Sequence, residues 1–467
     1  LFDEARLVYE KFVDITQNTE LTHRIVESYY RCGEIGKALM ICKSLRGEHG
    51  PIPYISQIEA AIDNEIGDLS EARKVYEEYL KKFPDDFDIK LELAVLNLRC
   101  DNLDAVDEFL KSRFDIDSLS FENSTKIAHL FGQRGLVKKY IEILYETRRK
   151  FFDNNQAHRI YIGAILNNEN EEWLECPTRV AADTVVWIED QSGETQHHII
   201  ENRKDADMRL NELCIDHSLC QKLLGESVGD TISYTSPVSE EIRKISKIEN
   251  KYIYAFQESL NRFNQLFPDN PGLWGISLGK GEQDAISPEG YKKIKDLVIK
   301  NSNRNKNISE YYQNRKLTVG AVANLIQKNV FYIWSDLIKS SDLGIYCTGG
   351  SAEERNHASS LIKTNVKLII DPISLATITE LKAVNLIIDN FGKLGVAQST
   401  VDTIQNAIME QKGIRSKSFL SLEKGDENVI PHEVSPKLVQ RTLEKFEEML
   451  SWVRTNCEIV HVKQPST

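Results

Sequence analysis

Apolar residues recur over the first 168 residues with helical spacing, and a longer period of 34 residues runs through the same stretch. Four apolar residues mark the longer period: Ile35, Leu69, Leu103 and Val137. Small residues recur near the same phase, at Ala38, Ala72 and Ala105. The proline of FPDD, Pro84, predicts the end of one helix. Because a short helix pair cannot bury its apolar stripe alone, the pattern predicts a solenoid of stacked pairs.

This 34-residue period, together with the small residues near its phase, resembles tetratricopeptide repeats. The resemblance covers residues 1–168 and implies that the concave face holds a protein partner or another part of the chain. A role as a spacer alone stays open at this point.

The pattern changes at Cys176-Pro177, where strand-like runs replace helical spacing. TRVAADTVVWIED and ETQHHIIEN predict two strands joined by a turn at Asp190 to Gly193. A short helix carrying Leu219 and Leu223 follows, and the segment from Thr231 to Tyr234 predicts a last strand. Residues 176–236 are therefore expected to form a small β-rich domain.

Within this domain, Leu223-Leu224-Gly225 and Val228-Gly229-Asp230 resemble the C-terminal domain of Gre-type transcript cleavage factors. The resemblance implies an FKBP-like α+β fold and a binding module for a protein such as RNA polymerase. It carries over no catalytic residues, because nothing in the chain matches the acidic coiled coil of those factors. A purely structural connector is the alternative.

Residues 237–360 are predicted to form a connecting segment of helices with a few α/β elements. Isoleucines at positions 242, 245 and 248 predict a helix from the segment SEEIRKISKIEN onward. PGLWGISLG predicts a strand, and NSNRNKN predicts a basic loop after a helix. LTVGAVANLIQKNVFYIWSDLI predicts two short helices, and Ile345 to Cys347 predict a strand that is followed by a Gly-Gly turn and a helix.

The last part of the chain, residues 361–467, contains the segment KLIIDPISLATITEL. An apolar strand runs to Asp371, and Pro372 opens the next helix. A short strand at Gly395 to Ala397 then leads into a helix with Asp402 in its first turn. In parallel sheets, ligands bind outside the carboxyl ends of the strands, where both carboxylates are expected. Asp371 is equally well placed to be only a helix cap.

This strand-Asp-helix order resembles the PIN domain, a metal-dependent nuclease fold. The resemblance implies that Asp371 and Asp402 are catalytic residues and ligands for Mg²⁺ or Mn²⁺. The family usually has Glu at the place of Thr403, so Asp402 lies one residue early. Glu380 is a weaker candidate, and Asp426, Glu427 and Glu433 fall in an expected loop. Further acids are expected beyond Thr467, since the chain reads as a fragment of a longer protein.

Composition narrows the function further. The chain has 467 residues with a net charge of −13, so a global basic surface for nucleic acid is excluded. The 8 cysteines form no CxxC pair, which favours a reduced, cytoplasmic protein. No apolar run approaches the ~20 residues that a membrane helix needs.

We therefore expect a multidomain protein, with a helical repeat solenoid, a small FKBP-like α+β domain and a PIN-like α/β domain with a parallel sheet. The order of these parts resembles a bacterial multidomain group linked to conflict and phage defence. The resemblance implies a metal-dependent ribonuclease that acts on RNA and is regulated by its protein-binding repeats. The alternative is a non-catalytic scaffold that recruits a protein partner such as RNA polymerase.

Overall fold

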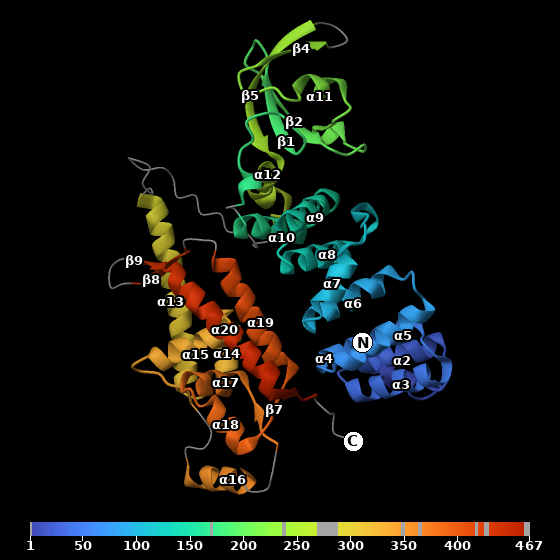
Figure 1. Cartoon of the computed structure of the whole chain (residues 1–467), viewed down its shortest axis with the longest axis vertical. Helices are drawn as coiled ribbons and strands as arrows, with labels where there is room; N and C mark the ends of the chain where they lie inside the picture. The colour runs from blue at the N-terminus through green and yellow to red at the C-terminus, as the bar shows by residue number, and fades with distance from the viewer. Residues whose placement is uncertain are drawn as a thin grey trace. The chain divides into compact units, whose positions relative to one another are not determined.

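The computed structural model describes residues 2–168, 171–235, 240–268, 288–346, 351–362, 367–415, 419–424 and 429–461. The chain forms two compact units. The first joins Leu1–Ala105 to Ile276–Thr467, and the second is Val106–Gly275. Figure 1 labels the elements of both.

The N-terminal part of the first unit consists of helices, each packed against the next in sequence. They are α1 (Phe2–Tyr9), α2 (Glu20–Arg31), α3 (Ile35–His49), α4 (Pro53–Glu65), α5 (Leu69–Lys82) and α6 (Phe87–Arg99). Pro84 lies in the connection between α5 and α6, as expected from the sequence. Asp68 and Asp86 cap the helices that follow them, because each accepts a hydrogen bond from a first-turn amide.

The 34-residue period of the sequence marks the start of every second helix. Ile35, Leu69, Leu103 and Val137 are the first residues of α3, α5, α7 (Leu103–Leu110) and α9 (Val137–Lys150). A residue with positive φ precedes each start by two positions: Gly33, Gly67, Asp101 and Gly135. A left-handed residue turns the chain sharply between paired helices, and glycine adopts it without strain. The helical repeat prediction is confirmed.

The second unit continues the helices and adds a five-stranded mixed sheet. Its further helices are α8 (Phe121–Gln133), α10 (Asn155–Asn167), α11 (Ser218–Leu223) and α12 (Lys251–Leu266), with short 3-10 turns at Ile116–Ser118, Glu172–Leu174 and Met208–Leu210. The strands are β1 (Thr184–Glu189), β2 (Thr195–Glu201), β3 (Glu212–Cys214), β4 (Thr231–Thr235) and β5 (Glu240–Asn250), in the order β3-β2-β1-β5-β4. Only the β2–β3 pair is parallel among them. α11 covers one face of the sheet (Figure 1), with Leu219 and Leu223 in its core.

The prediction of a helix at residues 240–250 is wrong, because β5 occupies them. Ile245 and Ile248 are buried in the sheet's core although they are three residues apart. A register shift opposite Trp187 and Ile188 inserts one extra residue into β5. That bulge turns both isoleucines to the same face and so imitates a helical period. The sheet therefore extends past the expected boundary at residue 236.

The connector of the first unit is helical over most of its described length. Its helices are α13 (Pro288–Gln313), α14 (Val319–Ile326), α15 (Val330–Lys339) and α16 (Ala352–Ile362). The prediction of a loop at NSNRNKN is wrong, because α13 continues through this segment. The segment contains no glycine or proline that would end the helix. α14 and α15 confirm the two short helices. No strand forms at Ile345 and Tyr346, and the strand expected in PGLWGISLG falls outside the described residues.

The C-terminal part of the first unit is a three-stranded parallel sheet with helices packed on it. The strands β6 (Ile369–Ile370), β7 (Leu394–Val396) and β10 (Cys457–Ile459) lie in the order β10-β7-β6. The helices are α17 (Pro372–Glu380), α18 (Val384–Phe391), α19 (Gln398–Arg415) and α20 (Pro436–Asn456). Their apolar side chains share one core with α15. A hairpin, β8 (Phe419–Lys424) and β9 (Val429–Val434), joins α19 to α20.

The described helices include none that is both long enough and apolar enough to cross a membrane.

Candidate active site

Asp371 lies at the carboxyl end of β6, and its carboxylate caps α17. Its Oδ1 accepts hydrogen bonds from the amides of Ile373 (2.8 Å) and Ser374 (3.0 Å). Its Oδ2 accepts a third from the Ser374 hydroxyl at 2.8 Å. The helix cap that the sequence left as an alternative role is therefore present, and Asp371 is exposed to solvent.

Asp402 lies in the second turn of α19 and is bound by an arginine that the sequence did not indicate. Arg99, at the end of α6, donates from Nε to Oδ1 (3.2 Å) and from Nη2 to Oδ2 (2.6 Å). Gln398, the first residue of α19, donates a third hydrogen bond to Oδ1 at 3.0 Å. The Arg99 and Asp402 side chains are 28% and 26% exposed, so the pair is partly shielded from water.

Both aspartates belong to the same edge of the sheet. β6 and β7 are parallel, with Ile370 opposite Val396. Asp371 directly follows the first strand, and the helix carrying Asp402 directly follows the second. The topology thus places Asp371 and the start of α19 at the same edge of the sheet, and a shared site of Asp371 and Asp402 stays a prediction.

The two carboxylates nevertheless do not form a divalent-cation site in this arrangement. Asp371 has both oxygens engaged by the first turn of α17, and Asp402 has both engaged by Arg99. Within the described ranges, no group of three or more His, Cys, Asp and Glu side chains is placed to hold a metal ion. Mg²⁺ and Mn²⁺ take several oxygen ligands. The donors match such a cation in type but not in number, and each carboxylate already accepts three hydrogen bonds.

The weaker acidic candidates lie elsewhere. Glu380, at the end of α17, forms an ion pair with Lys445 of α20, and the hydrogen bond from Lys445 lowers the pKa of Glu380. Glu433 lies in strand β9, not in the expected loop. Asp426 and Glu427 lie outside the described residues.

Arg99 was missed because nothing local distinguishes it. It is one of several charged residues that end a repeat helix, and its partner Asp402 is 303 residues away in sequence. Only the tertiary structure brings the two side chains together.

Residues 369–467 match a family model described as the PIN domain associated with the TPR-GreAB-C-PIN system. The C-terminal domain is PIN-like. The match begins at β6, two residues before Asp371, and includes β7, α19 and β10. The predicted combination of helical repeats, a mixed-sheet domain and a PIN-like domain is confirmed.

Several solved structures resemble part of the chain. A tetratricopeptide repeat protein from Parabacteroides merdae has a TM-score of 0.31 at 15% identity, over 36% of this chain and 67% of that one. MamA from Desulfovibrio magneticus has a TM-score of 0.28 at 13% identity, over 36% and 89%. TTC0263, a thermophilic TPR protein from Thermus thermophilus, has a TM-score of 0.28 at 13% identity, over 35% and 91%. No curated protein sequence matches the chain.

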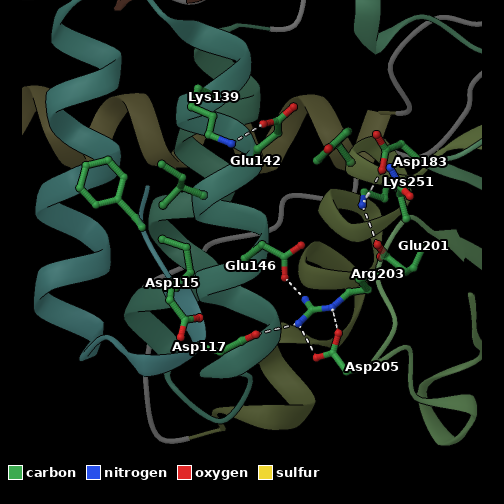
Figure 2. Close-up of a pocket in the computed structure, with 15 residues that line it drawn as sticks. Asp115, Asp117, Lys139, Glu142, Glu146, Asp183, Glu201, Arg203, Asp205 and Lys251 are labelled. Carbon is green, nitrogen blue, oxygen red and sulfur yellow. Dashed lines mark hydrogen bonds and ion pairs between the residues drawn. The ribbon is translucent and has the colours of Figure 1, made fainter. Parts of the chain in front are cut away.

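The second unit contains a charged cavity of about 570 Å³ between helix α9 and the mixed sheet (Figure 2). Arg203 forms ion pairs there with Asp117 (2.9 Å), Asp205 (2.6 Å) and Glu146. Burial raises the pKa of Glu146, while Arg203 opposes that rise. The guanidinium therefore holds together carboxylates from the helical part and from the segment after β2.

The same cavity is lined by a second cation, Lys251, which is more deeply buried than Arg203. Lys251 is only 4% exposed and lies 2.7 Å from Asp183 and 2.8 Å from Glu201. Figure 2 marks both ion pairs with dashed lines. Burial opposes the charge of Lys251, but the two carboxylates together raise its pKa. Tyr145 of α9 donates a hydrogen bond to the same Glu201 at 2.7 Å. Arg203 and Lys251 already form ion pairs with these carboxylates. We therefore interpret the cluster as a structural connection between the helices and the sheet, and call it the joint.

Proposed function

We propose that this protein is a metal-dependent endoribonuclease of a bacterial conflict system, with its helical repeats as the regulatory part. Asp371 and Asp402 are the carboxylates that carry the site in this proposal. The observation behind it is that both belong to the carboxyl edge of a parallel sheet whose residues match a PIN family. PIN domains are in general nucleases and typically use divalent cations, which neutralise charge at the phosphodiester.

The two aspartates have different tasks in this proposal. Asp371 is held in one orientation by the helix it caps, so its exposed carboxylate edge stays fixed at the end of β6. Asp402 is available only when Arg99 leaves it. RNA is the proposed substrate, and the cytoplasm the proposed location.

The first experiment measures cleavage of labelled RNA by the full chain with Mn²⁺ or with EDTA. Asp371→Asn is the informative variant, because asparagine keeps the helix cap while removing the charge. Alanine would also cost about 1 kcal/mol of cap stability and confuse the two roles. We expect Asp371→Asn and Asp402→Asn each to lower the cleavage rate at least a hundredfold.

Asp389→Asn provides the matched control, since Asp389 is an exposed carboxylate on α18 of the same domain. Its cleavage rate should equal that of the wild type. Full activity in the Asp371→Asn variant, with unchanged thermal stability, would exclude Asp371 from the site.

A scaffold that recruits RNA polymerase is the second candidate function. What favours it is that both aspartates are engaged and that the described residues supply no three-ligand cluster. Titration of purified bacterial RNA polymerase against the full chain tests it. Micromolar binding together with an absence of RNA cleavage under all metal conditions would favour the scaffold over the nuclease.

A further inference from the structure

Two turns of the N-terminal repeats, one repeat apart, contact the C-terminal domain within the first compact unit. In the α4–α5 turn, the carbonyl oxygen of Gly67 lies 3.0 Å from Nδ1 of His461, just after β10. In the α6–α7 turn, Asp101 forms an ion pair of 2.8 Å with Arg454 near the end of α20. On the repeat side, Gly67 and Asp101 lie on either side of Arg99 in sequence, while their partners His461 and Arg454 both follow Asp402.

Hydrogen bonds to Asn64 hold the Arg99 guanidinium in the orientation in which it binds Asp402. Its Nη1 donates to both the backbone oxygen and the side-chain Oδ1 of Asn64, each at 2.6 Å. The remaining donors, Nε and Nη2, make the two parallel bonds to Asp402. An arginine bound in this two-pronged manner to a carboxylate is among the stronger charge-assisted contacts in proteins.

Gly67 allows the close approach of the two parts. A Cβ atom at this position would lie 2.9 Å from Cβ of Gln398, the residue that donates to Asp402. Gly33, in the corresponding turn one repeat earlier, has nothing within 4 Å of such an atom. Both glycines have positive φ, +87° and +79°, so they differ in surroundings and not in backbone class.

We propose that the N-terminal repeats are a latch on the PIN-like domain, in which the Arg99 guanidinium occupies the Asp402 carboxylate in place of a divalent cation. This inference rests on the proposed nuclease function. The partner of this edge of the repeats is then the chain's own C-terminal domain. Activation is the release of the two repeat turns from the start of α19.

The physical basis is competition for one pair of oxygens. The guanidinium bridges both oxygens of Asp402 and puts a positive charge on the side where a cation would bind to both, and Gln398 uses the second lone pair of Oδ1. If the latch is closed for most of the time, the apparent metal affinity equals the affinity of the open form multiplied by the fraction of open molecules. A latch open in about one molecule in ten would weaken metal binding roughly tenfold, or ~1.4 kcal/mol.

The test compares four full-length proteins: wild type, Arg99→Gln, Gly67→Ala and the matched control Gly33→Ala. Mn²⁺ binding is titrated by calorimetry, and hydrogen exchange is followed in the segments 398–404 and 64–68 without metal. We expect Arg99→Gln and Gly67→Ala to bind Mn²⁺ about tenfold more tightly and to exchange faster in both segments. Gly33→Ala should match the wild type in both, because its added methyl group meets nothing.

Unchanged Mn²⁺ affinity and exchange in Arg99→Gln would overturn the latch, and so would equal effects of Gly67→Ala and Gly33→Ala. RNA cleavage by the same proteins separates this inference from the proposed function. Tighter Mn²⁺ binding in the two latch variants without any RNA cleavage keeps the latch and rejects the nuclease. Cleavage at one common rate, with unchanged Mn²⁺ affinity, keeps the nuclease and rejects the latch.

Discussion

At the scale of single residues, three aspartates of the first unit show how surroundings decide a role. Asp371 is exposed and caps a helix, and Asp402 is half-buried and held by Arg99. Asp63 of α4 has a side chain only 1% exposed, and neither of its oxygens has a hydrogen-bond partner. Burial raises the pKa of Asp63 to about 7, although Lys43 Nζ lies 3.8 Å away and opposes the rise.

Asp63 should make the repeats less stable as the pH rises. Because its folded pKa of about 7 is above its ordinary 3.8, the folded state binds the extra proton between these values. Stability therefore falls from about pH 4 to about pH 7 and stays low above that range. Asp63→Asn removes this dependence, so it should raise local stability more at pH 8 than at pH 5, by a difference of ~1–3 kcal/mol.

Hydrogen exchange of the α4 amides at pH 5 and pH 8, with wild type and variant compared at each pH, measures the effect. Asp85→Asn, in the exposed connection after α5, is the control and should change neither value. An equal effect of Asp63→Asn at both pH values would show that Asp63 stays charged in the folded protein.

At the scale of elements, close packing at glycine joins the three strands of the C-terminal sheet. Gly395 lies in β7, the central strand between β6 and β10. A Cβ there would lie 2.6 Å from Val460 Cγ2 and 3.2 Å from Ile369 Cγ1. The segments on both sides of β7 therefore approach position 395 so closely that only glycine fits there without a shift.

Gly395→Ala should destabilise the PIN-like domain by about 1–3 kcal/mol, because the added methyl group overpacks both neighbouring segments. Gly413→Ala is its counterpart in α19, where an added Cβ meets nothing within 4 Å. That change should stabilise the domain by up to ~1 kcal/mol, since alanine favours the helix. Urea denaturation followed by far-UV circular dichroism compares the two, and equal shifts of the same sign would contradict this account of Gly395.

At the scale of the whole molecule, ion pairs between distant segments fix one part of the chain to another. In the second unit, Arg203 and Lys251 connect the sheet to the helices through the cavity of Figure 2. Arg149 of α9 adds a two-pronged contact to Glu212, at 2.6 and 2.7 Å. Glu201 and Glu212 are buried, so loss of Lys251 or Arg149 would leave a buried carboxylate without its cation, whereas Asp117 and Asp205 beside Arg203 are exposed.

Arg203→Met should destabilise the second unit by about 1 kcal/mol, because it removes the ion pair of the partly shielded Glu146 and two ion pairs to exposed carboxylates. Glu146 loses its ion pair, and its already raised pKa should rise further. Arg209→Met is the control, because Arg209 is 90% exposed and pairs only with nearby Asp207 among the described residues. Thermal unfolding of both full-length variants measures the difference, and an Arg203→Met melting temperature equal to that of the control would contradict the role of the joint.

The sequence by itself determined the elements whose cause is local. The period of 34 residues set the helix starts from Ile35 to Val137, and the run before Asp371 set β6 and its cap. Where an element depended on its neighbours, local pattern misled, as in β5, whose bulge arises from pairing with β1. The sequence also predicted that β6 and β7 end at one sheet edge, which the parallel pairing shows, because parallel strands share a carboxyl end. Only the tertiary structure decided what each carboxylate touches, since the Arg99–Asp402 contact joins residues 303 positions apart that no local rule connects.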